Sequence, residues 1–270
     1  MPAPVTAVRR GAGGDLAVRG GLGLLAGLLF ALLAFPLAAL LLGAPPGELA
    51  RGLRDPAVLP AAALSLASTA ASLLVIVAGG TPLAWAIARG RGRRWRAVET
   101  LVELPAVLPP AVAGVALLLA FGRRGLLGPA LARLGVGVPF TLAAVVLAQS
   151  FVAAPFYVQA AVSAFRRLDP DLLFVARTLG ATRARVFLTV ALPVAQSGLA
   201  GGAALAWARA LGEFGATLMF AGNMPGRTQT LPLAIYTALE SDLRTAQSLS
   251  ILLVAAAFAL LVAVRAGRRP

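Results

Sequence analysis

Two pairs of charged residues in this sequence have a spacing that could support chemistry. Glu99 and Glu103 lie four residues apart, so one helix face would carry both carboxylates, which together could hold a proton or a metal ion. Arg209 and Glu213 have the same spacing and would form an ion pair on a helix. Five arginines within residues 89–96 favour a simpler interpretation of the first pair, in which carboxylates neutralise neighbouring positive charge.

The composition excludes most other kinds of catalytic site. All 24 basic residues are arginine, and the chain has no lysine, histidine or cysteine. A P-loop needs its lysine, so the chain cannot carry a standard ATP-hydrolysing site. Thiolate or imidazole metal sites, disulfides and Ser-His-Asp triads are excluded by the same absences. We therefore expect a chain with no catalytic residue, no metal and no cofactor of its own.

Long apolar runs dominate the rest of the chain. Of 270 residues, 59% are hydrophobic, and several runs exceed the roughly 20 apolar residues that cross a bilayer core. This predicts an all-α polytopic membrane protein. Apolar windows place about six spans at residues 20–43, 60–88, 101–121, 139–165, 194–212 and 246–264. None of the acidic residues falls near the middle of a predicted span, which argues against an ion-driven carrier.

The arginines alternate between the two sides of these spans. The larger group lies at residues 9–19, 89–96, 166–185 and 265–269, and the smaller at 51–54, 123–133, 227 and 244. The positive-inside rule then predicts that both termini are cytoplasmic. Because the arginines are scattered between spans, a topology signal explains them better than a nucleic-acid surface does. The first span could be a cleaved signal peptide, but its length favours a retained helix.

A polar segment interrupts the apolar runs after the fourth span. Asp169 suits the N-cap of a helix with Pro170 in its first turn, and we expect that helix at residues 170–179. Four apolar residues recur at helical spacing, so they would form one narrow apolar face of this helix. They are Leu172, Val175, Ala176 and Leu179.

The same segment continues into a second helix. Gly180 suits the left-handed position that ends a helix, and Thr182 can cap a following helix that carries Arg183. Leu192-Pro193 marks the return to the membrane. The pattern predicts a cytoplasmic helix-turn-helix that offers a surface to a partner, and an ordinary solvated loop is the alternative.

The spacing of this segment resembles the EAA loop of ABC-importer permeases. That pattern is Glu-Ala-Ala, three residues, Gly, nine residues, a hydrophobic residue, one further residue and Leu-Pro. The match in this sequence comprises Phe174, Val175, Ala176, Gly180, Val190, Leu192 and Pro193. Phe174 stands where the family has Glu, which removes one polar contact, and Val175 stands where it has Ala.

Other stretches are similar to the molybdate and sulfate permease group, namely "TPLAWAIARGRGRR", "ELPAVLPPAVAGVALL" and "ARALGEFGATLMFAGNMPGRTQTLPLAIY". The last is most similar to molybdate permeases. The resemblance implies the type I (MetI-like) importer fold in a bacterial plasma (inner) membrane. Residues 1–59 would form an N-terminal arm, the first helix and an outer loop, and residues 60–270 the permease core. Sulfate or tungstate is the alternative cargo, and an intramembrane enzyme is the rival from another class.

The resemblance also implies partners. Two permease copies would form the path, and two cytoplasmic ATPase subunits, which bind ATP and Mg, would receive the helix near 170–180 in a groove. A periplasmic or lipid-anchored binding protein would deliver the oxyanion. Within the coupling loop at about 169–193, contact with the ATPase would involve Asp169, Leu172, Ala176, Leu179, Gly180, Arg183, Leu192 and Pro193.

The remaining candidates concern the path and its outer mouth. The candidate path residues are Pro109, Pro110, Gly114, Arg209 and Glu213. Structural alternatives are a helix kink with close packing at the glycine, and an ion pair that staples a helix end. The candidate residues for docking the binding protein are Arg227, Thr228 and Thr230. Direct anion contact and a solvated turn are the alternatives there.

Overall fold

The computed structural model describes residues 12–43, 45, 47, 52 and 54–266, and every regular element among them is a helix. The chain divides into two compact units, residues 1–48 and 49–270, which are described separately. The first holds α1 (Ala12–Leu42), an apolar helix with Pro36 inside it. Its Arg19–Leu42 part is long and apolar enough to cross a membrane.

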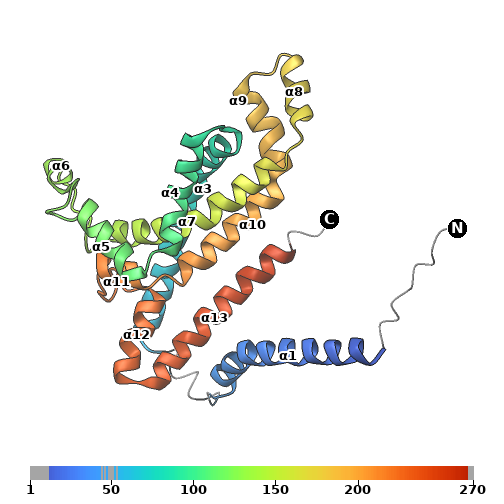
Figure 1. The fold of residues 1–270 in the computed structure, drawn as a ribbon. Helices are drawn as coiled ribbons and strands as arrows, with labels where there is room; N and C mark the ends of the chain where they lie inside the picture. The colour runs from blue at the N-terminus through green and yellow to red at the C-terminus, as the bar shows by residue number, and fades with distance from the viewer. Residues whose placement is uncertain (1–11, 44, 46, 48–51, 53, 267–270) are drawn as a thin grey trace. The chain divides into compact units, whose positions relative to one another are not determined.

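The second unit begins its helices at Val58. Its elements are α3 (Val58–Arg89), α4 (Arg93–Val107), α5 (Pro110–Phe121), α6 (Gly128–Arg133), α7 (Leu142–Arg166), α8 (Pro170–Thr178), α9 (Arg183–Val186), the π-helix η1 (Phe187–Ala191), α10 (Leu192–Leu211), α11 (Gly215–Ala221), α12 (Leu231–Ser241) and α13 (Leu243–Ala266). Helices α3, α7 and α10 pack on one another, and α8 and α9 form a hairpin at one end of the unit (Figure 1).

Small residues bring α7 and α10 close together. A Cβ atom added at Gly202 would lie 2.7 Å from the Cβ of Ala160, and one added at Gly198 would lie 2.5 Å from the Cβ of Ala164. Between apolar helices in lipid, such close approach supplies the van der Waals contact that holds them together. This pair therefore forms a rigid centre for the unit.

Hydroxyl groups on α3 add polar ties within this centre. The indole nitrogen of Trp207 on α10 donates to the Oγ1 of Thr69 at 3.0 Å. The backbone N–H of Leu231 donates to the Oγ of Ser65 at 2.7 Å, which satisfies a free amide at the start of α12. These bonds fix α3 to α10 and to the beginning of α12.

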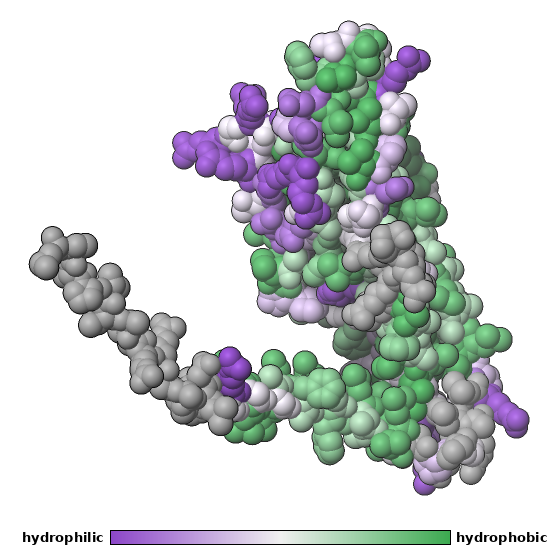
Figure 2. All heavy atoms as spheres, turned by 90° about the vertical axis from the view of Figure 1, so that its right-hand side faces the viewer, coloured by the Kyte–Doolittle hydropathy of each residue, from purple (hydrophilic) through white to green (hydrophobic). Residues whose placement is uncertain are grey.

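The surface of this unit is largely apolar. Figure 2 shows hydrophobic side chains over most of the visible face, with hydrophilic ones gathered towards the end that carries α8 and α9. Leu59 and Leu74 on α3 and Leu119 on α5 are each at least 65% exposed. Side chains of this kind are stable in contact with lipid tails, so the unit has the surface of a membrane protein.

The predicted third span, residues 101–121, is wrong as a single helix. Helices α4 and α5 meet at an angle of 117°, so they form a broken span or a re-entrant loop. Leu108 and Pro109 are both extended, because a residue before proline is driven out of the helical region and neither Pro109 nor Pro110 can donate to a preceding carbonyl. The described residues thus contain five helices able to span, or six if the bent pair counts as one.

The predicted start of the fifth span at residue 194 is also wrong. A continuous helical run of 29 residues extends from Arg183 to Leu211. Within it the N–H of Leu192 bonds to the carbonyl of Phe187, five residues back, as in a π-helix. This wider turn precedes Pro193 and shifts the carbonyls that its ring would otherwise meet, so the proline is accommodated without ending the helix.

Candidate functional site

The start of α8 follows the sequence prediction. The carboxylate of Asp169 accepts a hydrogen bond from the N–H of Asp171 at 2.9 Å, and Pro170 occupies the first turn. Proline has no N–H there to leave unsatisfied, and the negative charge of Asp171 is favourable near the positive end of the helix dipole. These contacts fix the start of α8 at Pro170.

The end of α8 has the hydrogen bonds of a Schellman motif. The N–H of Gly180 bonds to the carbonyl of Arg177 at 3.0 Å, and the N–H of Ala181 bonds to that of Ala176 at 3.1 Å. Gly180 has φ +86°, the left-handed region that favours glycine. Thr182 then caps α9 by accepting from the N–H of Arg185 at 3.3 Å. The predicted helix-turn-helix is confirmed in geometry.

The two sides of α8 differ in exposure. Leu172, Val175 and Leu179 are 50%, 53% and 82% exposed, and they form the greater part of the predicted apolar face. Ala176, the fourth predicted member, packs against the core together with the buried Leu173. Three large apolar side chains are therefore available to a partner, while one predicted member serves to hold the helix in place.

An aromatic cluster joins α3, α7 and η1 close to α8. The ring of Trp85 on α3 lies 5.2 Å from that of Phe165 on α7 and 5.4 Å from that of Phe187 on η1. Leu173 of α8 packs into the same core. This cluster was not predicted from the sequence. A signal was present, because each of the three aromatic residues lies near the predicted cytoplasmic end of an apolar span. Leu173 therefore connects α8 to the buried core in which these aromatic residues lie.

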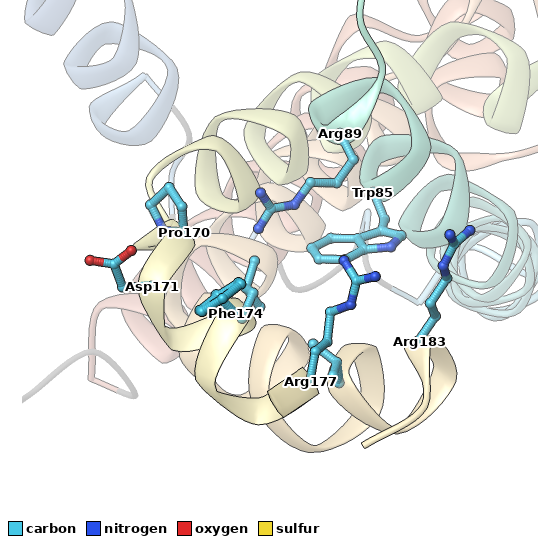
Figure 3. A pocket seen from close by; sticks show the side chains of 9 residues that line it. Trp85, Arg89, Pro170, Asp171, Phe174, Arg177 and Arg183 are labelled. Carbon is cyan, nitrogen blue, oxygen red and sulfur yellow. The ribbon is translucent and has the colours of Figure 1, made fainter. Parts of the chain in front are cut away.

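A cavity of about 680 Å³ lies between α8, α9 and the end of α3. Its lining residues are Trp85, Arg89, Pro170, Asp171, Leu173, Phe174, Arg177, Arg183 and Val186. The guanidinium carbon of Arg89 lies 4.9 Å from the centre of the Trp85 ring, in cation–π contact. Figure 3 shows the side chains of Arg89 and Arg177 extending towards the Trp85 ring from different elements.

A second cavity, of about 440 Å³, brings three of the five predicted path residues together. Pro110, Arg209 and Glu213 line it, and Met219, also in its lining, is in close contact with Gly114. A Cβ atom at Gly114 would lie 2.5 Å from the Cβ of Met219, so the glycine is required for α5 to pack on α11. The bend before Pro110 is what places the start of α5 beside this cavity. Pro109 is outside the lining and belongs to the bend.

The predicted ion pair is present in this cavity. The Nη1 of Arg209 lies 2.7 Å from the Oε2 of Glu213, whose side chain is 1% exposed, whereas that of Arg209 is 30% exposed. The other carboxylate oxygen of Glu213 accepts from the N–H of Ala216 at 2.9 Å. The pair therefore joins the end of α10 to the start of α11, and the side chain of Arg209 stays partly exposed. Both predicted roles, structural and in anion passage, are compatible with this geometry.

The predicted docking residues have different surroundings. Thr228 and Thr230 are buried, at 0% and 1% exposure, so neither can contact a docking protein in this structure. Thr228 Oγ1 accepts from the N–H of Met224 at 3.0 Å, which closes a turn around residues 224–228. Arg227 is exposed. The sequence showed polar residues after a Pro-Gly turn but not that the turn folds their hydroxyls inward.

Glu99, a candidate acid or base, is held by an arginine. Both of its carboxylate oxygens are bonded by the guanidinium of Arg166, at 2.9 and 2.8 Å. The described residues contain no group of three or more acidic, histidine or cysteine side chains that could hold a metal ion. The bidentate pair ties α4 to the end of α7. The carboxylate neutralises an arginine, as predicted, but that arginine lies on α7 and not among the five at residues 89–96.

Comparison with known sequences places this geometry among transport proteins. Residues 80–266 match the family described as "Binding-protein-dependent transport system inner membrane component". The chain is 47% identical over 203 residues to the molybdenum transport system permease protein ModB of Mycobacterium tuberculosis, covering 75% of this chain and 77% of that protein. It is 37% identical to the probable transport system permease protein NifC of Clostridium pasteurianum, covering 89% and 85%. It is 40% identical to ModB of Escherichia coli K12, covering 66% and 78%.

Solved structures with the same fold are also transporter components. A bacterial ABC transporter involved in the import of alginate aligns with a TM-score of 0.74 at 18% identity, covering 93% of both chains. The methionine ABC transporter MetNI, in an inward-facing conformation, aligns with a TM-score of 0.58 at 21% identity, covering 82% of this chain and 96% of that one. At these identities the likeness concerns the fold alone.

Proposed function

Because the chain belongs to the family of binding-protein-dependent transport system inner membrane components, we propose that it is the permease subunit of an ATP-driven importer for molybdate. The observation that carries the proposal is 47% identity to a molybdenum transport permease over three quarters of the chain. The exposed apolar face of α8, at the end of an apolar helical unit, supports it from the structure. The chain is a transport component of the membrane.

The proposed assembly contains two copies of this chain, two ATPase subunits and one oxyanion-binding protein. ATP and Mg would bind to the ATPase subunits, in keeping with the absence of lysine from this chain. The distribution of arginines supports a topology in which α8, α9 and both termini face the cytoplasm. The binding protein would then dock at the opposite face, where Arg227 remains the exposed candidate.

Coupling would begin at α8. Leu172, Val175 and Leu179 would enter an apolar groove of the ATPase, which favours binding by removing apolar surface from water. Gly180 ends the helix cleanly, so the segment can behave as one rigid body. Closure of the ATPase subunits would displace α8, and the aromatic contacts of Trp85 would pass that displacement to the long helices.

The oxyanion would pass beside the cavity at the end of α10. A tetrahedral dianion attracts a guanidinium that keeps free N–H donors, and Arg209 is 30% exposed while one of its nitrogens bonds Glu213. The carboxylate holds the guanidinium in position and reduces the net charge of the site. This combination favours brief contact over tight capture, which suits a permease whose partner binds the cargo.

Two alternatives make different predictions. Sulfate or tungstate could be the cargo of the same assembly, since this chain has only to pass a tetrahedral dianion. An intramembrane enzyme would need a free acid or base, and the pairing of Glu99 with Arg166 and of Glu213 with Arg209 weighs against it.

The test is ATP-dependent uptake of labelled molybdate into vesicles that contain this chain with its ATPase and binding protein. We expect uptake that tungstate competes and sulfate does not, and none with a non-hydrolysable ATP analogue. Competition by sulfate would assign the chain to sulfate transport. Absence of ATP-dependent uptake of any oxyanion would refute the importer proposal.

A further inference from the structure

The cavity beside α8 carries an excess of positive charge that the coupling role does not explain. Three of its lining residues are the arginines Arg89, Arg177 and Arg183, and its one acidic lining residue is Asp171. Within the described residues, no carboxylate forms an ion pair with any of the three guanidiniums. In Figure 3 the carboxylate of Asp171 points away from them. Arginines that line one cavity without a counter-charge favour binding of an anion.

The walls of the cavity are chemically mixed. Trp85, Leu173 and Val186 supply apolar surface, and Trp85 already orients the guanidinium of Arg89 by cation–π contact. An apolar wall excludes water from one side and strengthens each guanidinium–anion hydrogen bond. The site is therefore built for a compact anionic group and offers apolar surface beside it.

The cavity lies on a different face of α8 from Leu172 and Leu179, and Arg183 is the one predicted ATPase contact in its lining. At 3.6 residues per turn, Phe174 and Arg177 lie about half a turn around the helix axis from Leu172 and Leu179. The cavity would thus stay accessible at the side of α8 while its apolar face is covered by a partner. This separation argues against the ATPase groove as its occupant.

At Phe174 the cavity lining has an aromatic ring where the loop pattern has a carboxylate. The loop pattern that the segment resembles has Glu at this position, and here Phe174 lines the cavity instead. A carboxylate at residue 174 would lie on the same wall as Arg177. Its replacement by an aromatic ring leaves the arginines available to an anion from outside the chain.

We propose that the cavity between α8, α9 and the end of α3 binds a tetrahedral oxyanion group through Arg89, Arg177 and Arg183. Two sources share this chemistry: the phosphate of an anionic phospholipid and a free oxyanion in solution. Cavities with basic side chains at the ends of membrane helices are suited to lipid head groups. The free anion would fit the same guanidiniums without using the apolar wall.

The test uses the purified full-length chain in neutral detergent after removal of lipid. Binding of labelled molybdate and of inorganic phosphate is measured by equilibrium dialysis, and retention of phosphatidylglycerol against phosphatidylcholine by native mass spectrometry. Arg177→Gln should weaken binding about tenfold, because one charge-assisted contact is lost. Arg185→Gln, which removes an exposed arginine outside the lining, should leave binding unchanged.

Phe174→Glu gives an independent test, because its carboxylate should occupy the arginines and abolish binding, while Phe174→Gln should retain it. Binding of the free anions identifies a soluble oxyanion as ligand, and selective retention of phosphatidylglycerol alone identifies a lipid head group. Failure to bind any of these, or equal binding by the Arg177→Gln and unaltered chains, would overturn the proposal. Transport is not the readout, so that failure would leave the importer proposal standing.

Discussion

Substitution of Gly180 tests whether the shape of the coupling segment matters for transport. Its φ of +86° is unfavourable for any residue with a Cβ atom. A Cβ atom at this position would have no other atom within 4 Å, so Gly180→Ala introduces backbone strain without a steric clash. The strain costs about 1–2 kcal/mol, which shifts the equilibrium away from the native end of α8 by about 5- to 30-fold.

Two further substitutions separate strain from charge. Asparagine tolerates the left-handed region better than alanine, so Gly180→Asn should be the milder change. Gly180→Asp has nearly the same shape as Gly180→Asn and adds a negative charge beside the predicted ATPase contact. We therefore expect coupling to fall in the order Gly, Asn, Ala, and to be lost in Asp while the protein stays folded in the membrane.

The assay is the ATPase activity of the complex in nanodiscs, with and without loaded binding protein. Gly135→Ala is the matched control, because Gly135 has φ +72° and equally open surroundings but lies in the turn after α6. Gly135→Ala should carry the same strain and keep normal stimulation. Equal stimulation of the ATPase in Gly180→Asp and in the unaltered chain would refute the coupling role. If Gly135→Ala lost as much stimulation as Gly180→Ala, the effect could not be assigned to the segment around Gly180.

Three other predictions concern stability. Arg209→Gln should destabilise the protein by about 3–5 kcal/mol because it leaves a buried carboxylate unpaired, and adding Glu213→Gln should restore the thermal unfolding temperature. Gly202→Val should lower that temperature by forcing α10 away from Ala160, at a cost of about 1–3 kcal/mol, whereas a change of the exposed Leu74 to Val should have little effect. Bonds from the Thr245 hydroxyl and the Arg244 N–H lower the pKa of Asp242, so its contribution to the start of α13 is present above the unfolded-state pKa and lost as the pH falls through the lower folded-state value. A lower protection of the amides at that helix start on acidification, measured against the intrinsic exchange rate at each pH, would show this, and Asp242→Asn should remove the pH dependence of that protection.

The elements that local chemistry determines were predictable from the sequence. Asp169, Gly180 and Thr182 each act within three residues of their own position, so the limits of α8 and the start of α9 could be read directly. Four of the six apolar spans followed in the same way from length and composition. The i,i+4 pair of Arg209 and Glu213 is also a local feature and was found.

The features that the sequence did not reveal depend on contacts between distant segments. Pro109-Pro110 indicated a break, but the angle of 117° depends on the packing of α5 against α11. Pro193 indicated a helix boundary. A proline can either end a helix or lie within one whose hydrogen bonds are locally rearranged, and here the π-turn before Pro193 gives the second outcome. The burial of Thr228 follows from a turn closed by backbone bonds to Met224, which residue type alone does not show.

Because the helical run from Arg183 to Leu211 is unbroken, α9, η1 and α10 form one continuous arm. From Phe187 to Arg209 the arm is about 33 Å long at 1.5 Å per residue. If the π-turn serves as its pivot, a tilt of about 10° carries Arg209 through about 6 Å. Bending within α10 would reduce that movement, so the stiffness of this helix determines how far a small displacement near Phe187 moves Arg209 at the other end.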